Sequence, residues 1–343
     1  MRFSHRFFLY APFALVVLVA LAAGAWWWVA SRAVSNYLDA SNGHAIAPGV
    51  TLHFTGKQIA GFPFRVDAIL DNAQIDVATS QGPASWRSEH FAMHALTYGP
   101  RQAIYEAAGQ QTLRWTGLDG KPHVWTFTPT VLRASSYNQS TGPNSGLARF
   151  DLDAIAIRSP ELNADRFQFH LRRNPKRDGL DIVVTGQGIH LSPALQAGFG
   201  DTIRTLHLDA SAVPATPLTA LLGGKRDWRA SLENWRGHGG AFTLNALGVD
   251  WNTLKASATG QLSLDAQHRP AGLLKLNLDG VQSLAAGLAR LGLAQGDNNG
   301  LAPALLMMAE ASNAQIQLSA DVGFQDGIVT VGGTPAGVLR PIY

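Results

Sequence analysis

The sequence predicts a mainly β protein in which an N-terminal transmembrane helix precedes a long, curved, antiparallel β-sheet with a few short helices. Three observations lead to this prediction. An uncharged run covers residues 7–30, apolar and polar residues alternate with period two from about residue 50, and 35 glycines supply turns between the alternating runs. A sheet of this length must curl, close or split into two packed layers.

The uncharged run is long enough to cross a membrane. Its 24 residues would form a helix of roughly 36 Å, whereas the hydrocarbon core of a bilayer is about 30 Å thick. It closes with three indole side chains, which favour the membrane–water interface: Trp26, Trp27 and Trp28. Because Arg2 and Arg6 precede the run, the positive-inside rule predicts a bacterial inner-membrane protein with a periplasmic C-terminal domain. The bilayer, contacted through residues 7–30, is the first expected partner.

A cleaved signal peptide is the alternative. Ala23-Gly24-Ala25 fits the A-x-A cleavage pattern, and cleavage there would release a soluble periplasmic protein. However, the apolar run is longer than the roughly 7–15 residues of a signal-peptide core. Cleavage would also leave the three tryptophans exposed at the start of the mature chain. An uncleaved anchor is therefore favoured.

Alternation defines the expected strands and domains. The alternating runs are 50–55, 64–70, 73–79, 111–116, 124–128, 147–157, 166–171, 180–184, 203–210, 241–249, 254–264, 272–278, 315–322 and 328–331. Asp71-Asn72 is expected to be a turn, and helices are expected at 228–235, 281–293 and 301–311. The expected domains are an anchor at 1–32, a linker at 33–49 and a β-rich domain at 50–343, with a subdivision near 214–226.

Composition argues against several function classes. The net charge of +3 is too weak and too dispersed to indicate a nucleic-acid partner. The chain has no cysteine, which excludes disulfides, thiol catalysis and cysteine-based metal sites. It contains no nucleophile elbow, Walker A loop, dinucleotide fingerprint or calcium loop. No catalytic residue, cofactor or metal ligand is therefore expected.

Two polar clusters each allow two interpretations. His90 and His94 have the spacing of a helical metal pair, but their segment also alternates like a strand. Residues four apart in a strand lie about 13 Å apart, which favours structural histidines. The basic residues at 172–177 are typical of a solvated hairpin tip. Contact with an anionic headgroup or lipopolysaccharide is the alternative for that cluster.

One segment interrupts the alternation between two expected strands: Gly61, Phe62, Pro63, Phe64 and Arg65. Its proline removes an amide donor, and its glycine permits an unusual backbone angle. A structural corner is favoured, with both phenylalanines plugging one end of a core. The mouth of a ligand site is the alternative.

These residues also carry a resemblance. The 61–65 segment after an N-terminal anchor, then Trp86 and Tyr98-x-Pro100, resembles the bacterial family called domain of unknown function 2125. The later runs 249–265, 270–272 and 326–335 are similar to that family too. The tract from Trp251 to Gly272 also resembles the envelope AsmA-like proteins, whose sheets form long lipid-handling grooves. The first family carries no established activity, so the resemblance implies no catalytic residues.

The sequence therefore favours a non-enzymatic envelope protein that binds or passes lipid or another hydrophobic ligand. The candidate contacts are Phe54, Phe62, Phe64, Phe91 and Trp125. The alternative is a scaffolding module that binds another envelope protein through a sheet edge or apolar patch.

Overall fold

The computed structural model describes residues 5–79, 82–117, 120–139, 146–174, 176–196, 199–218, 228–252, 254–280 and 317–342. The chain forms two compact units. The first unit comprises residues 1–126 and 133–137, and the second comprises 127–132 and 138–343. The boundary between the units therefore lies at residues 126–138 of the sequence. The subdivision expected near 214–226 falls inside the second unit.

The N-terminal helix is longer than the apolar run. Helix α1 (His5–Ser41) has 37 residues, and its Pro12–Ser41 part is long and apolar enough to cross a membrane. The segment expected to be a linker at 33–49 is therefore helical to Ser41 and then forms strand β1 (His44–Ala47). The helix continues because its last turns are packed: Leu38 is only 5% exposed and lies in the core of the first unit.

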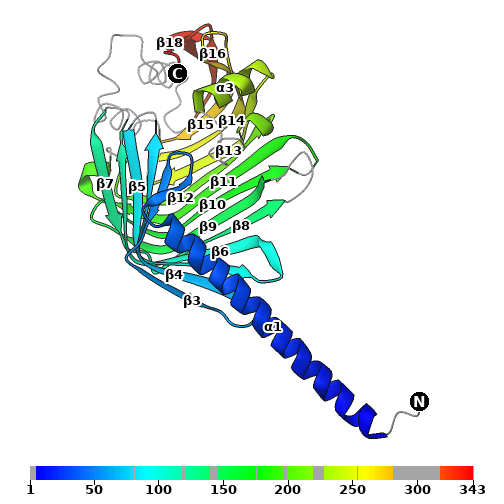
Figure 1. The fold of residues 1–343 in the computed structure, drawn as a ribbon. Helices are drawn as coiled ribbons and strands as arrows, with labels where there is room; N and C mark the ends of the chain where they lie inside the picture. Colours follow the sequence, from blue (N-terminus) through cyan, green and yellow to red (C-terminus); the bar gives the residue numbers. More distant parts are fainter. Residues whose placement is uncertain are drawn as a thin grey trace. The chain divides into compact units, whose positions relative to one another are not determined.

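The first unit is a meander of antiparallel strands. They are β1, β2 (Val50–His53), β3 (Gly56–Ala60), β4 (Arg65–Thr79), β5 (Gly82–Leu96) and β6 (Gly99–Thr116). Both β2 and β3 pair with β4, and β4 pairs with β5, which pairs with β6. Figure 1 shows α1 reaching this sheet beside β3 and β4, which its C-terminal part contacts. Strands β7 (Pro122–Phe127) and β8 (Val131–Gln139) follow, and the chain passes from one unit to the other within them.

Irregularities in β4, β5 and β6 lie side by side across the sheet of the first unit. Asn72, expected in a turn, instead sits inside the continuous strand β4 with a φ of 50°. The register between β5 and β6 shifts between Ser88 and His90, and Gly109 in β6 has a φ of 74°. An extra residue in a strand reverses the side-chain alternation beyond it. Apolar side chains on both halves of these strands therefore remain on the same face.

The second unit continues the meander in sequence order. Its strands are β9 (Gly146–Arg158), β10 (Leu162–Asn174), β11 (Gly179–Leu191), β12 (Thr202–Val213), β13 (Ala241–Trp251), β14 (Leu254–Leu264), β15 (Pro270–Asp279), β16 (Gln317–Gln325), β17 (Ile328–Val331) and β18 (Thr334–Val338). Each pairs antiparallel with the next. The 3₁₀ turn η1 (Pro193–Leu195) and helix α3 (Trp228–Gly237) are also described. Val331 and Ala336 are fully buried in the core cluster of its last strands.

The predicted class is confirmed: the protein is mainly β and antiparallel, with one N-terminal apolar helix and few other helices in the described ranges. The helix predicted at 228–235 is present as α3. The helices predicted at 281–293 and 301–311 lie outside the described residues. The strands β1, β3, β5, β8 and β18 were missing from the predicted set.

Candidate functional site

Helix α1 is attached to the first unit at the turn between β3 and β4, residues 61–65, which we call the corner. Trp27 Nε1 donates a hydrogen bond of 2.8 Å to the Arg65 carbonyl oxygen. Trp26 Nε1 donates one of 3.2 Å to the carbonyl oxygen of Thr97, in the turn between β5 and β6. The rings of Trp27 and Phe62 meet edge to face with centroids 5.3 Å apart. Two of the three predicted interface tryptophans therefore hold the helix to the sheet.

The corner is a tight turn whose aromatic side chains face outward. Gly61 has a φ of 95°, and a Cβ there would lie 2.7 Å from the Arg65 carbonyl oxygen, so glycine is required. The Arg65 amide donates to the Gly61 carbonyl at 3.1 Å and closes the turn. The corner interpretation is confirmed, but the predicted core plug is wrong. Phe62 and Phe64 are 64% and 65% exposed, because the turn points them away from the sheet.

A row of aromatic side chains crosses the first unit next to its core. Phe91 on β5 lies opposite Leu70 on one side and Ala107 on the other. Its ring meets Trp86 edge to face at 5.6 Å and stacks on Tyr105 at 6.2 Å. All three rings are half-buried. We call Trp86, Phe91 and Tyr105 the aromatic row.

The opposite face of the same strands carries charges. Asp67 is 4% exposed and accepts hydrogen bonds from His94 at 2.7 Å and Arg65 at 2.9 Å. His94 Nε2 lies 3.9 Å from Glu106, which also pairs with Arg133 at 2.8 Å. Carboxylates and basic side chains therefore alternate across four strands, and the carboxylates of Asp67 and Glu106 both have partners. Pairing among the side chains of one face in this way is typical of structural contacts between strands.

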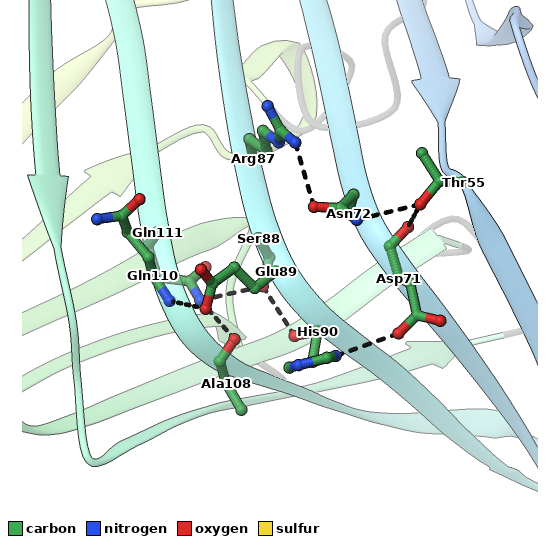
Figure 2. Close-up of polar contacts among 10 residues, drawn as sticks. All are labelled: Thr55, Asp71, Asn72, Arg87, Ser88, Glu89, His90, Ala108, Gln110 and Gln111. Carbon is green, nitrogen blue, oxygen red and sulfur yellow. Dashed lines mark hydrogen bonds and ion pairs between the residues drawn. The ribbon is translucent and has the colours of Figure 1, made fainter.

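A second polar row follows the irregular level of the strands (Figure 2). Arg87 donates to the Asn72 side chain at 3.1 Å, and Asn72 donates to the Thr55 hydroxyl at 3.1 Å. The Thr55 hydroxyl donates to the Asp71 carbonyl at 3.2 Å, and the Asp71 carboxylate contacts His90 at 3.1 Å. His90 and His94 thus lie on a strand and bind different carboxylates. Within the described ranges no group of three metal-binding side chains occurs.

Figure 2 also shows the polar contacts that Gln111 and Ser88 make beside the bulge. Gln111 and Ser88 are fully buried, and Gln111 donates to the Ser88 hydroxyl at 3.0 Å. Ser88 donates in turn to the His90 carbonyl at 2.8 Å. Trp86 Nε1 donates to Gln111 at 3.1 Å, which ties one end of the aromatic row to this buried pair. Fully bonded polar groups of this kind fix the register of a sheet.

The second unit holds a pocket of about 540 Å³ beside the basic hairpin tip. The tip is confirmed as the turn between β10 and β11, where Asn174 pairs with Gly179. Both signs of charge line the pocket: Arg149, His170, Arg172, Arg177, Asp151, Asp181 and Asp209. Several of these side chains pair with each other, as Arg149 and His170 do with Asp151 and Arg177 does with Asp181. This pairing favours the interpretation of a solvated, structural surface. Contact of this tip with an anionic headgroup stays a prediction.

Asp151 in this pocket gives a testable pH dependence. Partial burial raises the pKa of Asp151, but hydrogen bonds and charge from His170 and Arg149 outweigh it and lower the pKa below its ordinary value. The ionised group therefore stabilises the fold above its unfolded pKa of about 3.9, and this stability is lost as the pH falls through the lowered folded value. We expect the urea midpoint to fall less between about pH 5 and pH 3 in Asp151→Asn than in the natural protein. Equal falls in both proteins would contradict this assignment.

A family model matches nearly the whole chain. It is described as "Uncharacterized protein conserved in bacteria (DUF2125)", and it matches residues 27–340. The chain belongs to this family. No curated protein matches the chain, so the resemblance to AsmA-like proteins stays a prediction.

The DUF2125 match begins at Trp27 and therefore includes the contact between the helix and the corner. The five candidate ligand contacts are not gathered in one place. Phe54 and Phe91 pack against the core cluster of the first unit. Phe62 and Phe64 lie in the corner, and Trp125 lies half-buried on β7. Their roles in binding stay predictions.

The sequence of this DUF2125 protein does not reveal which side chains contact Phe91 and His94. The sequence does not identify Tyr105 or Asp67 as a site residue, because each lies in a strand without a local motif. Their contacts join β4, β5 and β6, and only the register of those strands reveals them. In the sequence Trp86 contributes only to the family resemblance, and its place in the aromatic row follows from the bulge between it and Phe91.

Proposed function

We propose that this protein is a non-enzymatic bacterial envelope protein, anchored in the inner membrane by α1 with its sheet in the periplasm. On this proposal it binds or passes a hydrophobic ligand such as a phospholipid acyl chain. The observation that carries the proposal is the half-buried aromatic row beside the end of α1. The anchor is retained rather than cleaved, and Trp26 and Trp27 bind it to the sheet through hydrogen bonds.

The end of α1 covers only part of the apolar face. Leu38 and Val34 pack in the same cluster as Leu70 on β4. The face continues onto β5 and β6, where Phe91 and Tyr105 are only half-buried. Aromatic rings offer large apolar area with little conformational entropy to lose, and each buried methylene of an acyl chain contributes about 0.8 kcal/mol. The aromatic row therefore suits an extended apolar ligand.

The attachment of α1 also brings this face close to the bilayer. The helix continues for 11 residues beyond Ala30, to Ser41, which corresponds to about 16 Å. Leu38 and Lys57 hold this section against the sheet, the latter through a bond of 3.0 Å to the Ser35 carbonyl. On the proposed anchoring, a packed helix instead of a flexible linker would hold the sheet near the membrane surface. Such placement suits exchange of lipid with the membrane.

Photo-crosslinking tests the ligand. The full-length protein in phospholipid nanodiscs would be irradiated with a phospholipid that carries a diazirine in its acyl chain. We expect crosslinks on β5 and β6, reduced about tenfold or more in Phe91→Gln. The reason is that losing about 1.5–3 kcal/mol of apolar burial corresponds to at least a tenfold change in affinity.

The matched control is Ile104→Gln. Ile104 neighbours Tyr105 on β6, lies opposite His94 on the charged face and is 38% exposed. This variant should keep full crosslinking on β5 and β6. Crosslinks confined to α1 would contradict a lipid site. A single dominant protein crosslinked to the sheet in cells would favour the scaffolding function instead.

A further inference from the structure

We infer that the first unit makes a second contact with the bilayer, in which the exposed rings of Phe62, Phe64 and Tyr98 enter the headgroup and upper acyl region beside α1. This inference rests on the proposed anchoring of α1 in the membrane. It assigns a role to the corner and to the Thr97–Tyr98 turn that the ligand proposal does not use.

The first step is the level of the corner along the helix. Trp27 lies between eight and nine residues from the middle of the uncharged run 7–30, which corresponds to about 13 Å along the helix axis. Half of the hydrocarbon thickness is about 15 Å. Because Trp27 and Trp26 bond to the backbone of Arg65 and Thr97, both turns are held at this boundary.

The second step is the position of Phe62. A Cβ placed on Gly24 would lie 3.7 Å from the Phe62 ring, so the ring rests against α1 one turn before Trp27. Gly24 lies only about 8 Å from the middle of the uncharged run by the same rise per residue. The tip of the corner therefore reaches below the level of the tryptophans, beside a lipid-facing part of the helix.

The third step is the exposure of the neighbouring rings. Phe64 is 65% exposed and Tyr98 is 73% exposed, although both lie next to a helix with a large apolar surface. Tyrosine favours the membrane interface, because its ring is apolar and its hydroxyl can remain hydrated. Arg65, whose side chain is 58% exposed and pairs with Asp67 at 2.9 Å, adds a guanidinium to this surface, which suits contact with lipid phosphates. The chemistry of this surface fits the headgroup boundary of a bilayer.

Site-directed spin labelling tests this contact. The chain has no cysteine, so single cysteines can be labelled cleanly in the full-length protein. Nitroxides would be placed at Phe64→Cys and Tyr98→Cys in phospholipid nanodiscs. Accessibility to oxygen and to a water-soluble nickel chelate would then be measured by power saturation. We expect oxygen access to dominate at both positions.

Two further labels make the outcome decisive. Val124 on β7 is 57% exposed and apolar, and its neighbour His123 stacks on Trp115. Trp115 follows Arg114, which pairs with Ser85 at the end of the β5–β6 ladder away from the corner, so Val124→Cys is the control. It should show nickel access. Val17→Cys in α1 should show oxygen access.

The labels also separate the two proposals. Labels at positions 64 and 98 that resemble the one at 124, with position 17 in lipid, would overturn the second contact and leave the anchor intact. Nickel access at position 17 would overturn the anchor and this inference together.

Discussion

Replacing Gly260 or Gly272 by alanine is expected to destabilise the second unit by about 3 kcal/mol or more. Gly260 has a φ of 152°, and its Cβ would lie 2.2 Å from the Leu273 carbonyl oxygen. Gly272 has a φ of 144°, and its Cβ would lie 2.2 Å from the Gln261 carbonyl oxygen. Both clashes are with paired backbone of the neighbouring strand, which cannot move without breaking the β14–β15 ladder. Backbone strain and this clash add to the expected loss.

The measurement is urea unfolding of the purified full-length protein, followed by the circular dichroism of its strands. The control is Gly248→Ala on the adjacent strand β13, where a Cβ would meet nothing within 4 Å. That variant should stay within about 0.5 kcal/mol of the natural protein. If all three variants unfolded at the same urea concentration, the close approach of these two strands would be refuted.

Leu38→Ala is expected to destabilise the first unit by about 2–5 kcal/mol. Leu38 is 5% exposed, and it packs in one cluster with Leu52 and Leu70. Truncation removes buried apolar surface and leaves a cavity that the sheet can only partly fill. The last turns of α1 should then separate from the sheet. Faster amide hydrogen exchange in residues 31–41 would show this directly.

Tyr37→Ala is the matched control for that variant. Tyr37 is the adjacent residue on α1 and is 59% exposed. Its loss should change stability by no more than about 0.5 kcal/mol and leave exchange in α1 unaltered. Unchanged exchange in Leu38→Ala would mean that the hydrogen bonds of the tryptophans alone hold the helix.

The class of the fold was predictable because its signals are local. The alternation at 203–210, for example, gives β12 directly. In the first unit, bulges interrupt this alternation, so it does not reveal every strand. Trp86 and Phe91 are five residues apart and share a face only because the register shifts at Ser88–His90. A strict two-residue period therefore hides strand β5, and Asn72 inside β4 looks like a turn residue.

The candidate site was predictable in parts but not as a whole. The tryptophans were expected at an interface and the 61–65 segment was expected as a corner, each from local chemistry. Their contact joins Trp27 to Arg65, 38 residues away, and depends on the register of β3 against β4. The last turns of α1 look like a linker in the sequence, because Val34 and Leu38 form a recognisable apolar face only when a sheet packs against them.

The bond from Trp27 to the Arg65 carbonyl has a mechanical consequence. A helix whose apolar length exceeds the local bilayer thickness responds by tilting. Because the helix and the corner are joined by this bond and by the ring contact with Phe62, a change in tilt turns the first unit as well. On the proposed anchoring of α1, membrane thickness would then set the orientation of the first unit, with its aromatic row, relative to the bilayer.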